Sequence, residues 1–274
     1  MIPVLLKAAL PKLRAGSELP DLSLERHDVP IDVDHAAAYA ALCGFPRKDT
    51  LPLPYPHLLA FGLHLRIMAD GSFPFPAIGT VHLENSITQH RPIAVTEKLQ
   101  VTARPDNLRP HAKGQVFDMV TRVHSRGELV WEETSTFLRR GPGTEVSTGS
   151  TTEVCAPPTG TVWKLPGDLG RRYAGISGDH NPIHLYGLTA KAFGFPRQIA
   201  HGMWSLARCV GALENRLPGN VQVDVAFKKP ILLPGTVAFG HEALAGDAAG
   251  DQVFALTRPK DGAPHLTGRA TRVT

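Results

Sequence analysis

Long apolar runs are missing from this chain of 274 residues. A membrane-spanning helix needs about 18 or more consecutive apolar residues, and no such run occurs here. The apolar patch near the N-terminus is interrupted by Lys7, Pro11 and Lys12 and lacks a signal-peptide cleavage pattern. We therefore expect a soluble, cytoplasmic protein that has no membrane partner.

Cysteine and clustered basic residues are also scarce. The three cysteines, Cys43, Cys155 and Cys209, lie far apart and form no CxxC or Cys/His spacing, which argues against a disulfide scaffold or a zinc site and for a reducing compartment. The net charge is only +4 and no run of Lys or Arg occurs, so we expect no nucleic-acid partner. The basic bias allows at most a local preference for anions.

The hydrophobic content of 42% is enough for a real core, and the apolar periodicity predicts two similar series of elements. The first series comprises a helix capped by Asp34 and stopped by Gly44, a largely buried helix at 57–68 and strands at 79–90, 99–105, 114–124 and 129–139. The second comprises a helix from Asp168 to Gly178, a short helix from Pro182, a third helix at 202–213 and strands at 221–227, 236–243, 252–258 and 265–273.

An internal repeat accounts for the two series. Four residues of the first half recur 134 positions later: Asp34, Tyr39, Ala40 and Gly44 match Asp168, Tyr173, Ala174 and Gly178. The tripeptide at 91–93 matches that at 229–231 at an offset of 138. We expect a duplicated domain with an N-terminal unit at 1–140, a Gly/Ser/Thr/Pro-rich linker at 141–160 and a C-terminal unit at 161–274.

Polar residues gather at 179–184 in the second unit only. The constant offset places Asp179, Asn181 and His184 opposite Phe45, Arg47 and Thr50 of the first unit. This asymmetry suits a cavity with a chemical end in the second unit and an apolar binding end in the first.

The segment 179–184 has the spacing of an acid–base site. Asn181-Pro182 reads as an N-cap followed by proline at the first helical position, which starts a helix running through Ala192. Asp179 then lies just outside the helix and His184 within its first turn, so both point toward one spot with Asn181 between them. A carboxylate and an imidazole there can hold a water molecule and move its proton.

Acyl chemistry also needs a donor for a carbonyl oxygen. Gly202 opens the third helix, whose first turn leaves backbone N–H groups free, and a glycine permits close approach of a thioester. The Gly202 N–H is therefore the candidate oxyanion donor. His201, just before it, is a candidate for substrate contact or for a structural role at the helix entrance.

Other chemistries are less well supported by the pattern. Asp179, His180 and His184 could ligate a metal, but no further ligand cluster is evident, so we expect no metal. Ser177 lacks the surroundings of a nucleophile and is interpreted as a turn residue. His57 precedes an apolar helix and is interpreted as structural.

Three ordered motifs resemble the signature of the MaoC-like (R)-specific enoyl-CoA hydratases. They are Tyr173-x-x-x-Ser177-Gly178-Asp179-x-Asn181-Pro182-Ile183-His184, Phe195-x-x-x-Ile199-Ala200-His201-Gly202-Met203 and Phe227-x-x-Pro230-x-x-x-Pro234-Gly235. The third is one residue longer between its prolines than the usual spacing. The likeness covers about residues 165–274, and the first half resembles the degenerate copy of double hotdog members.

The resemblance implies an α+β double hotdog fold, in which each unit wraps a curved antiparallel sheet around a central helix. It implies reversible hydration of trans-2-enoyl thioesters, or dehydration of (R)-3-hydroxyacyl thioesters, in fatty-acid metabolism. Asp179 and His184 resemble the catalytic pair, Asn181 their support and Gly202 the oxyanion donor. Which of the pair removes the proton from water stays open. No cofactor is implied beyond the CoA or acyl-carrier-protein thioester substrate.

Further residues are candidates for substrate binding. Phe45, Leu58 and Phe61 could line an acyl groove or could equally belong to the core. Arg197, Lys228 and Lys229 could meet the phosphates of CoA or an acidic carrier protein, or could be solvated surface residues. Two other functions stay open: a hotdog thioesterase, and a non-catalytic acyl-thioester-binding subunit. A monomeric pseudo-dimer and a homodimer are both compatible with a two-unit chain.

Overall fold

In the residues that the structure describes, two series of five strands form the sheet. A computed structural model describes residues 18–76, 79–143, 160–244 and 251–273. The first series is β1 (Leu24–Pro30), β2 (Thr80–Gln89), β3 (Lys98–His111), β4 (Gly114–Ser125) and β5 (Glu128–Arg140). The second is β6 (Thr161–Leu165), β7 (Val221–Phe227), β8 (Gly235–Ala243), β9 (Gln252–Thr257) and β10 (Pro264–Arg272).

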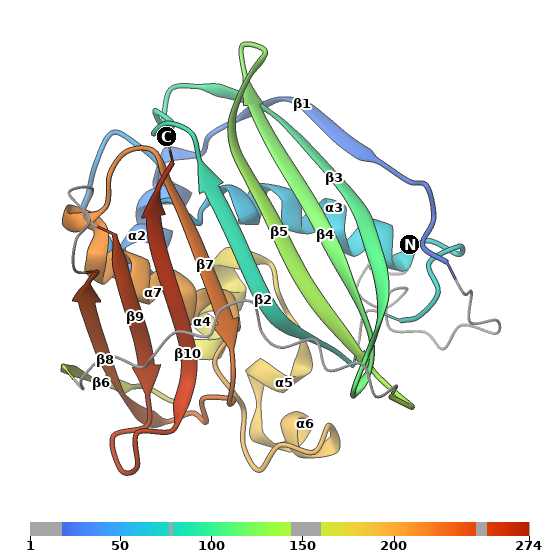
Figure 1. The fold of residues 1–274 in the computed structure, drawn as a ribbon, viewed down its shortest axis with the longest axis vertical. Coiled ribbons are helices and arrows are strands. Elements are labelled where there is room, and N and C mark those ends of the chain that lie inside the picture. Colours follow the sequence, from blue (N-terminus) through green and yellow to red (C-terminus); the bar gives the residue numbers. More distant parts are fainter. Residues whose placement is uncertain (1–17, 77–78, 144–159, 245–250, 274) are drawn as a thin grey trace.

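The ten strands form one sheet with a symmetric order, β1-β3-β4-β5-β2-β7-β10-β9-β8-β6 (Figure 1). Each strand of the first series occupies the place that its counterpart occupies in the second, counted from opposite edges. The two series join at the centre, where β2 pairs antiparallel with β7 and Ile87 lies opposite Val223. The sheet therefore has the pseudo-twofold symmetry that the duplicated sequence predicts.

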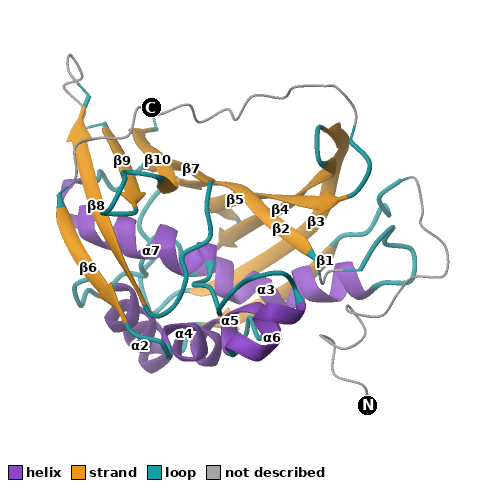
Figure 2. Cartoon of the chain, turned by 90° about the horizontal axis from the view of Figure 1, so that it is seen from below, coloured by secondary structure: helices purple, strands orange, loops and turns teal. Residues whose placement is uncertain are grey.

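The helices cover one face of this sheet (Figure 2). The first half contributes α2 (Val33–Cys43) and α3 (Pro56–Ala69), and the second α4 (Leu169–Ser177), α5 (Pro182–Leu185), α6 (Gly187–Ala192), α7 (Gly202–Leu213) and a 3₁₀ turn, Glu214–Arg216. Helices α3 and α7 lie directly against the sheet, and α2, α4 and α5 lie outside them. No helix in the described ranges is both long and apolar enough to cross a membrane.

The core between sheet and helices follows from the predicted alternation. Val221, Val223 and Val225 of β7 are fully buried, and so are Leu206 and Val210 on the facing side of α7. Burying such side chains contributes roughly 1.5–3 kcal/mol each to folding. The expectation of two units, each with a central helix wrapped by antiparallel strands, is confirmed.

Several boundaries of helices and strands differ from those that the sequence predicts. The N-cap of α2 is Asp32, whose side chain accepts a hydrogen bond of 3.0 Å from the His35 N–H, so the prediction that Asp34 is the cap was wrong. Helices α2 and α4 both end at a left-handed glycine, Gly44 at φ 77° and Gly178 at φ 76°, as predicted. The short helix from Pro182 is broken at Tyr186 into α5 and α6. Strand β6 was not predicted, and most of the predicted linker (144–159) lies outside the described residues.

The hydrogen bonds also correct the alignment of the two halves. The Val95 N–H donates to Asp49, as the Leu233 N–H donates to Gln198. Gly178 and Gln198 are 20 positions apart, whereas Gly44 and Asp49 are only 5 apart, so the second half carries 15 additional residues here.

Thr50 shows the consequence. It bridges to Ala94 as Ile199 bridges to Leu232, so its counterpart is Ile199 and not His184. The constant offset fails after Gly178 because the polar segment belongs to an insertion rather than to a substituted copy.

The backbone of α4 holds this insertion in place through a glycine. A Cβ added at Gly170 would lie 2.0 Å from the His184 carbonyl oxygen. The backbone of α5 therefore occupies the space that a side chain at position 170 would need. Gly175, on the same helix, has no atom within 4 Å of such a Cβ.

We predict that Gly170→Ala lowers the free energy of unfolding by about 1–3 kcal/mol, because the methyl group overpacks the contact between α4 and α5. The same change at Gly175 should stabilise the protein by up to about 1 kcal/mol, because alanine favours the helix. Urea denaturation of both variants measures the difference. Equal effects of the two substitutions would contradict the proposed contact.

Candidate active site

Asp179 lies in the turn that follows α4. The left-handed Gly178 turns the chain, the Asp179 N–H donates to Ser177 Oγ at 3.2 Å, and the Asn181 N–H donates to Asp179 Oδ1 at 3.1 Å. Asn181 caps α5 with its own side chain, which accepts from the Ile183 N–H at 3.4 Å. These local bonds fix the Asp179 carboxylate before any distant residue contributes.

His184 lies in α5 and is buried. Its Nδ1 is 2.8 Å from the Ile199 carbonyl oxygen, and because a carbonyl only accepts, Nδ1 carries the proton of the neutral ring. The lone pair therefore lies on Nε2. The Ile199 N–H returns a hydrogen bond of 3.1 Å to Ile183, so the segment before α7 holds α5 from two sides.

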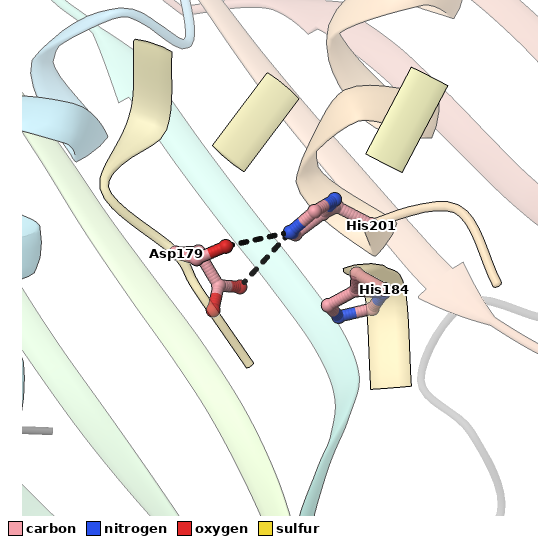
Figure 3. A group of neighbouring side chains, drawn as sticks. All are labelled: Asp179, His184 and His201. Atoms are coloured by element: carbon pink, nitrogen blue, oxygen red, sulfur yellow. Dashed lines mark hydrogen bonds and ion pairs between the residues drawn. The ribbon is translucent and has the colours of Figure 1, made fainter. Parts of the chain in front are cut away.

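His201 joins the two parts of the site. Its Nε2 is 3.0 Å from the Asp179 carbonyl oxygen and 3.7 Å from Asp179 Oδ2. Its ring stacks on that of His184 at a centroid distance of 3.7 Å. Figure 3 shows the three side chains converging on one small volume. Of the two roles open for His201, the contacts favour support of Asp179.

The charges of these groups follow from their surroundings. Burial opposes ionisation of Asp179, but the imidazoles of His201 and His184 and the Asn181 N–H outweigh it, so the pKa of Asp179 is lowered. Burial lowers the pKa of His184, although Asp179 opposes this, and burial together with His184 lowers the pKa of His201 to about 3. At neutral pH the site holds a carboxylate beside two neutral imidazoles.

Asp179, His184 and His201 also have the composition of a metal site, with one ligand atom of each within 4.8 Å of the others. The hydrogen bonds argue against that use. The His201 Nε2 faces the Asp179 carbonyl oxygen, so this nitrogen carries a proton and has no lone pair for a metal. The arrangement is better suited to proton transfer.

A cavity of about 270 Å³ opens at these residues and is lined by both halves of the chain. Eight of the candidate residues line it: Asp179, Asn181, His184, His201, Gly202, Phe61, Lys228 and Lys229. The first half adds Leu65 and Met68 of α3, Val81 of β2 and Phe137 of β5. The apolar end predicted for the first unit is therefore present, with a larger lining than the sequence indicated.

Three candidates lie elsewhere, which corrects the expectation that they bind substrate in this cavity. Phe45 is buried in the core, where it stacks near Tyr39 and lies close to Gly211 of α7. Leu58 packs against the core, and Arg197 is exposed outside the cavity lining. Phe45 follows the helix-ending Gly44 and so turns inward beneath α7, which the sequence alignment did not reveal.

Gly202 begins α7 at the cavity wall. A Cβ there would lie 3.2 Å from the Phe227 ring, so any other residue would push against this aromatic side chain. The first turn of a helix has N–H groups without intrahelical partners, and here its first residues, Gly202 and Met203, line the same cavity as Asp179 and His184. The position fits an oxyanion donor.

The sequence reading missed a second polar group in the cavity wall. His57 lines the cavity and its Nδ1 lies 2.8 Å from Glu133 Oε2. A signal existed in each residue: Glu133 occupies an inward position of a strand, and His57 shares the helical face of Phe61 and Met68. Neither signal alone pairs them, because they are 76 positions apart.

Fold and site together define a hotdog-type protein with an acid–base site between two fused units. Residues 143–257 match the MaoC like domain family. The chain is 39% identical over 262 residues to 3-hydroxyacyl-thioester dehydratase X of Mycobacterium tuberculosis, covering 94% of this chain and 92% of that protein. The chain therefore belongs to the MaoC-like dehydratase family and is an enzyme of the hydratase/dehydratase class.

Solved structures agree with this assignment. The crystal structure of HtdX of Mycobacterium tuberculosis superposes with a TM-score of 0.80 at 38% identity, covering 92% of this chain and all of that one. A further Mycobacterium tuberculosis protein, described as having a double hotdog fold, superposes with a TM-score of 0.57 at 13% identity over 92% of this chain and 96% of its own. That second likeness concerns the fold alone, and the predicted double hotdog is confirmed.

The buried histidines should lower the free energy of unfolding at acidic pH. Burial lowers the pKa of His64, His82 and His201 from 6.5 to about 3, so between these values the unfolded chain binds protons that the folded chain excludes. The free energy of unfolding should then fall below about pH 6.5, by up to about 1.4 kcal/mol per pH unit for each histidine. His57 has a raised pKa and is protonated in both states below 6.5, so it affects only the range above that value.

Urea denaturation between pH 5 and pH 7 measures this slope. His82→Gln removes one of the histidines whose pKa is lowered to about 3 and should make the dependence on pH shallower. A free energy of unfolding that stays constant from pH 7 to pH 5 would contradict the assignment of neutral buried imidazoles.

Proposed function

We propose that this enzyme adds water reversibly to trans-2-enoyl thioesters and, in the opposite direction, dehydrates (R)-3-hydroxyacyl thioesters. The observation that carries the proposal is the convergence of Asp179, His184 and Gly202 at one end of a cavity whose other wall includes the apolar side chains of Phe61, Leu65 and Met68. The relative of 39% identity is named for dehydration of 3-hydroxyacyl thioesters, which supports the same substrate class.

The proposed chemistry needs one water molecule and no other reactant. The water lies between the Asp179 carboxylate and His184 Nε2, which are both bases at neutral pH. As its oxygen bonds to C3 of the enoyl thioester, one of these bases takes its proton. The same proton is then delivered to C2 from the same face, which completes the addition and restores the site.

The backbone N–H of Gly202 stabilises the negative charge that develops on the thioester oxygen. The free N–H groups at the start of α7 lie at the end of a 12-residue helix, whose dipole favours negative charge there. Asn181 supports the reaction indirectly, because its backbone N–H holds the Asp179 carboxylate. No step in this scheme requires a metal or an organic cofactor.

The other residues that line the cavity indicate where the acyl chain and the phosphates of the substrate bind. Phe61, Leu65 and Met68 form one face of α3 along the cavity, where an acyl chain would bury apolar surface. Lys228 and Lys229 are exposed where the cavity opens, a position that suits the phosphates of CoA or of a carrier-protein phosphopantetheine.

Substitution of the acid–base pair should test the chemistry. We expect Asp179→Asn and His184→Ala to lower kcat/KM for hydration of crotonyl-CoA or a longer enoyl-CoA by roughly 10²–10⁴, because each removes a proton-transfer group. Loss of the conjugated enoyl-thioester absorbance measures the reaction.

His180→Ala is the matched control, because His180 is an exposed neighbour whose ring hydrogen-bonds to the Gly178 carbonyl of its own turn and does not line the cavity. It should retain wild-type activity. Full activity in both folded active-site variants would overturn the assignment, and thiol release from saturated acyl-CoA would indicate a thioesterase instead.

Charge reversal should test the phosphate end. Lys228→Glu and Lys229→Glu should raise KM for an enoyl-CoA and leave kcat nearly unchanged, because the lysines act on binding and not on the reacting atoms. The same enoyl group on N-acetylcysteamine, which lacks phosphates, should show no change. An equal effect on both thioesters would contradict a role in phosphate binding.

A further inference from the structure

A chain of buried polar side chains runs from the sheet into the cavity in the first half of the protein. Asn85 Nδ2 donates to Ser135 Oγ at 3.0 Å and to Glu133 Oε1 at 2.7 Å. The His57 Nδ1–H donates to Glu133 Oε2 at 2.8 Å. His57 thus stands at the cavity end of a connected series of hydrogen bonds.

Every member of this network is buried. His57 is 5% exposed, and Asn85, Glu133 and Ser135 are at most 1% exposed. Burial disfavours both charges of the pair, but their mutual attraction outweighs it, so the pKa of His57 is raised and that of Glu133 is lowered. Replacing such a pair by apolar residues is often neutral or stabilising, so stability alone gives little reason for its presence.

The second ring nitrogen of His57 is free to meet a ligand. In the part of the chain that the structure describes, all hydrogen bonds of His57 use Nδ1, and Nε2 has no protein partner. Nor is Nε2 among the fully buried polar atoms that lack partners. Because the side chain is otherwise enclosed and lines the cavity, the accessible surface of Nε2 opens into it.

We propose that His57, anchored by Glu133, is a substrate-contacting residue whose Nε2–H donates a hydrogen bond to an oxygen atom of the bound acyl thioester. The inference rests on the proposed function and extends it, because it gives the first half of the chain a polar role beside the apolar groove. A charged donor left facing a hydrocarbon chain would lose its hydration without replacement. A bound substrate that places an oxygen there removes this penalty.

Two parts of the substrate can supply the oxygen. The first is the reacting end, at the thioester carbonyl or C3, where His57 would add a charged donor to the Gly202 N–H. The second is an oxygen substituent further along the acyl chain, in which case His57 selects oxygenated acyl groups. Both sources share the same chemistry, a hydrogen-bond acceptor on the acyl group.

The test measures kcat and KM of the wild type, His57→Leu, His57→Gln and Glu133→Gln on two enoyl-CoA substrates of equal length, one alkyl and one with a hydroxyl at C5. If the oxygen lies at the reacting end, His57→Leu should lower kcat/KM on both substrates by ~10²-fold, mainly through kcat. If it lies on the chain, only the hydroxylated substrate should lose activity. In either case His57→Gln, which keeps a neutral donor, should restore part of the activity, and Glu133→Gln should fall between it and the wild type.

Glu97→Gln is the control for loss of a carboxylate. Glu97 pairs with Arg91 and Ser125 in the same half but does not line the cavity, so its loss should leave kcat and KM unchanged. Changes of less than about threefold on both substrates, in His57→Leu or in His57→Gln if the leucine variant does not fold, would overturn the inference while leaving the proposed function intact. A wild-type enzyme inactive on both substrates would overturn the proposed function, and the inference with it.

Discussion

The contact between His201 and Asp179 is the interaction on which the site depends. It links the start of α7, which is anchored in the core by Leu206 and Val210, to a turn that belongs to the inserted segment. Without it, the Asp179 carboxylate would be held only by bonds within its own turn. The stacking of His201 on His184 extends the same link to the second base. One buried imidazole therefore contacts both proton-transfer groups and adds to the bonds that hold them near the proposed oxyanion donor, Gly202.

The fold explains why only one half carries this arrangement. The two halves share their strand order and the glycine that ends α2 and α4, so the frame itself does not create a site. The difference is the 15 residues added between Gly178 and Gln198, which include α5 and bring His184 beneath the segment before α7. In the first half the chain crosses this distance in the short segment from Gly44 to Asp49, which does not line the cavity. The acid–base residues are thus confined to one half by a difference in chain length.

The sequence predicted most of the fold because the informative patterns are local. Alternation in 221–227 identified β7, and Gly44 and Gly178 identified two helix ends. Strand β6 was missed because it lies at the edge of the sheet. Four of its five residues are not fully buried, so its sequence shows no alternation of apolar and polar residues. Phe45 was misplaced because its surroundings depend on packing against α7, which no local pattern contains.

The candidate site likewise contains residues that local sequence patterns predict and residues that only tertiary packing brings together. Asp179, Asn181 and His184 lie within six residues, so helix-capping rules applied to the sequence were enough to predict that they lie close together. The pair of His57 and Glu133 could not be found by such rules, because it forms only when α3 packs against the sheet. Residue types that are common in cores and on surfaces acquire a role there only through tertiary contact.

Two carboxylates stay ionised in this region, Asp179 in the cavity wall and Glu133 buried behind His57, because each has its own hydrogen-bond donors. Glu133 and Asp179 would each raise the pKa of the other if they were the only charges present. Glu133 instead accepts a hydrogen bond from the imidazolium of His57, and Asp179 accepts one from the Asn181 N–H and lies near the N–H group of the neutral His201 ring. His57 also interacts favourably with Asp179, so the imidazolium of the first half helps to keep the base of the second half charged. The two halves are therefore coupled through the electrostatics of the cavity as well as through the sheet, and a change of charge at either pair alters the proton affinity of the other.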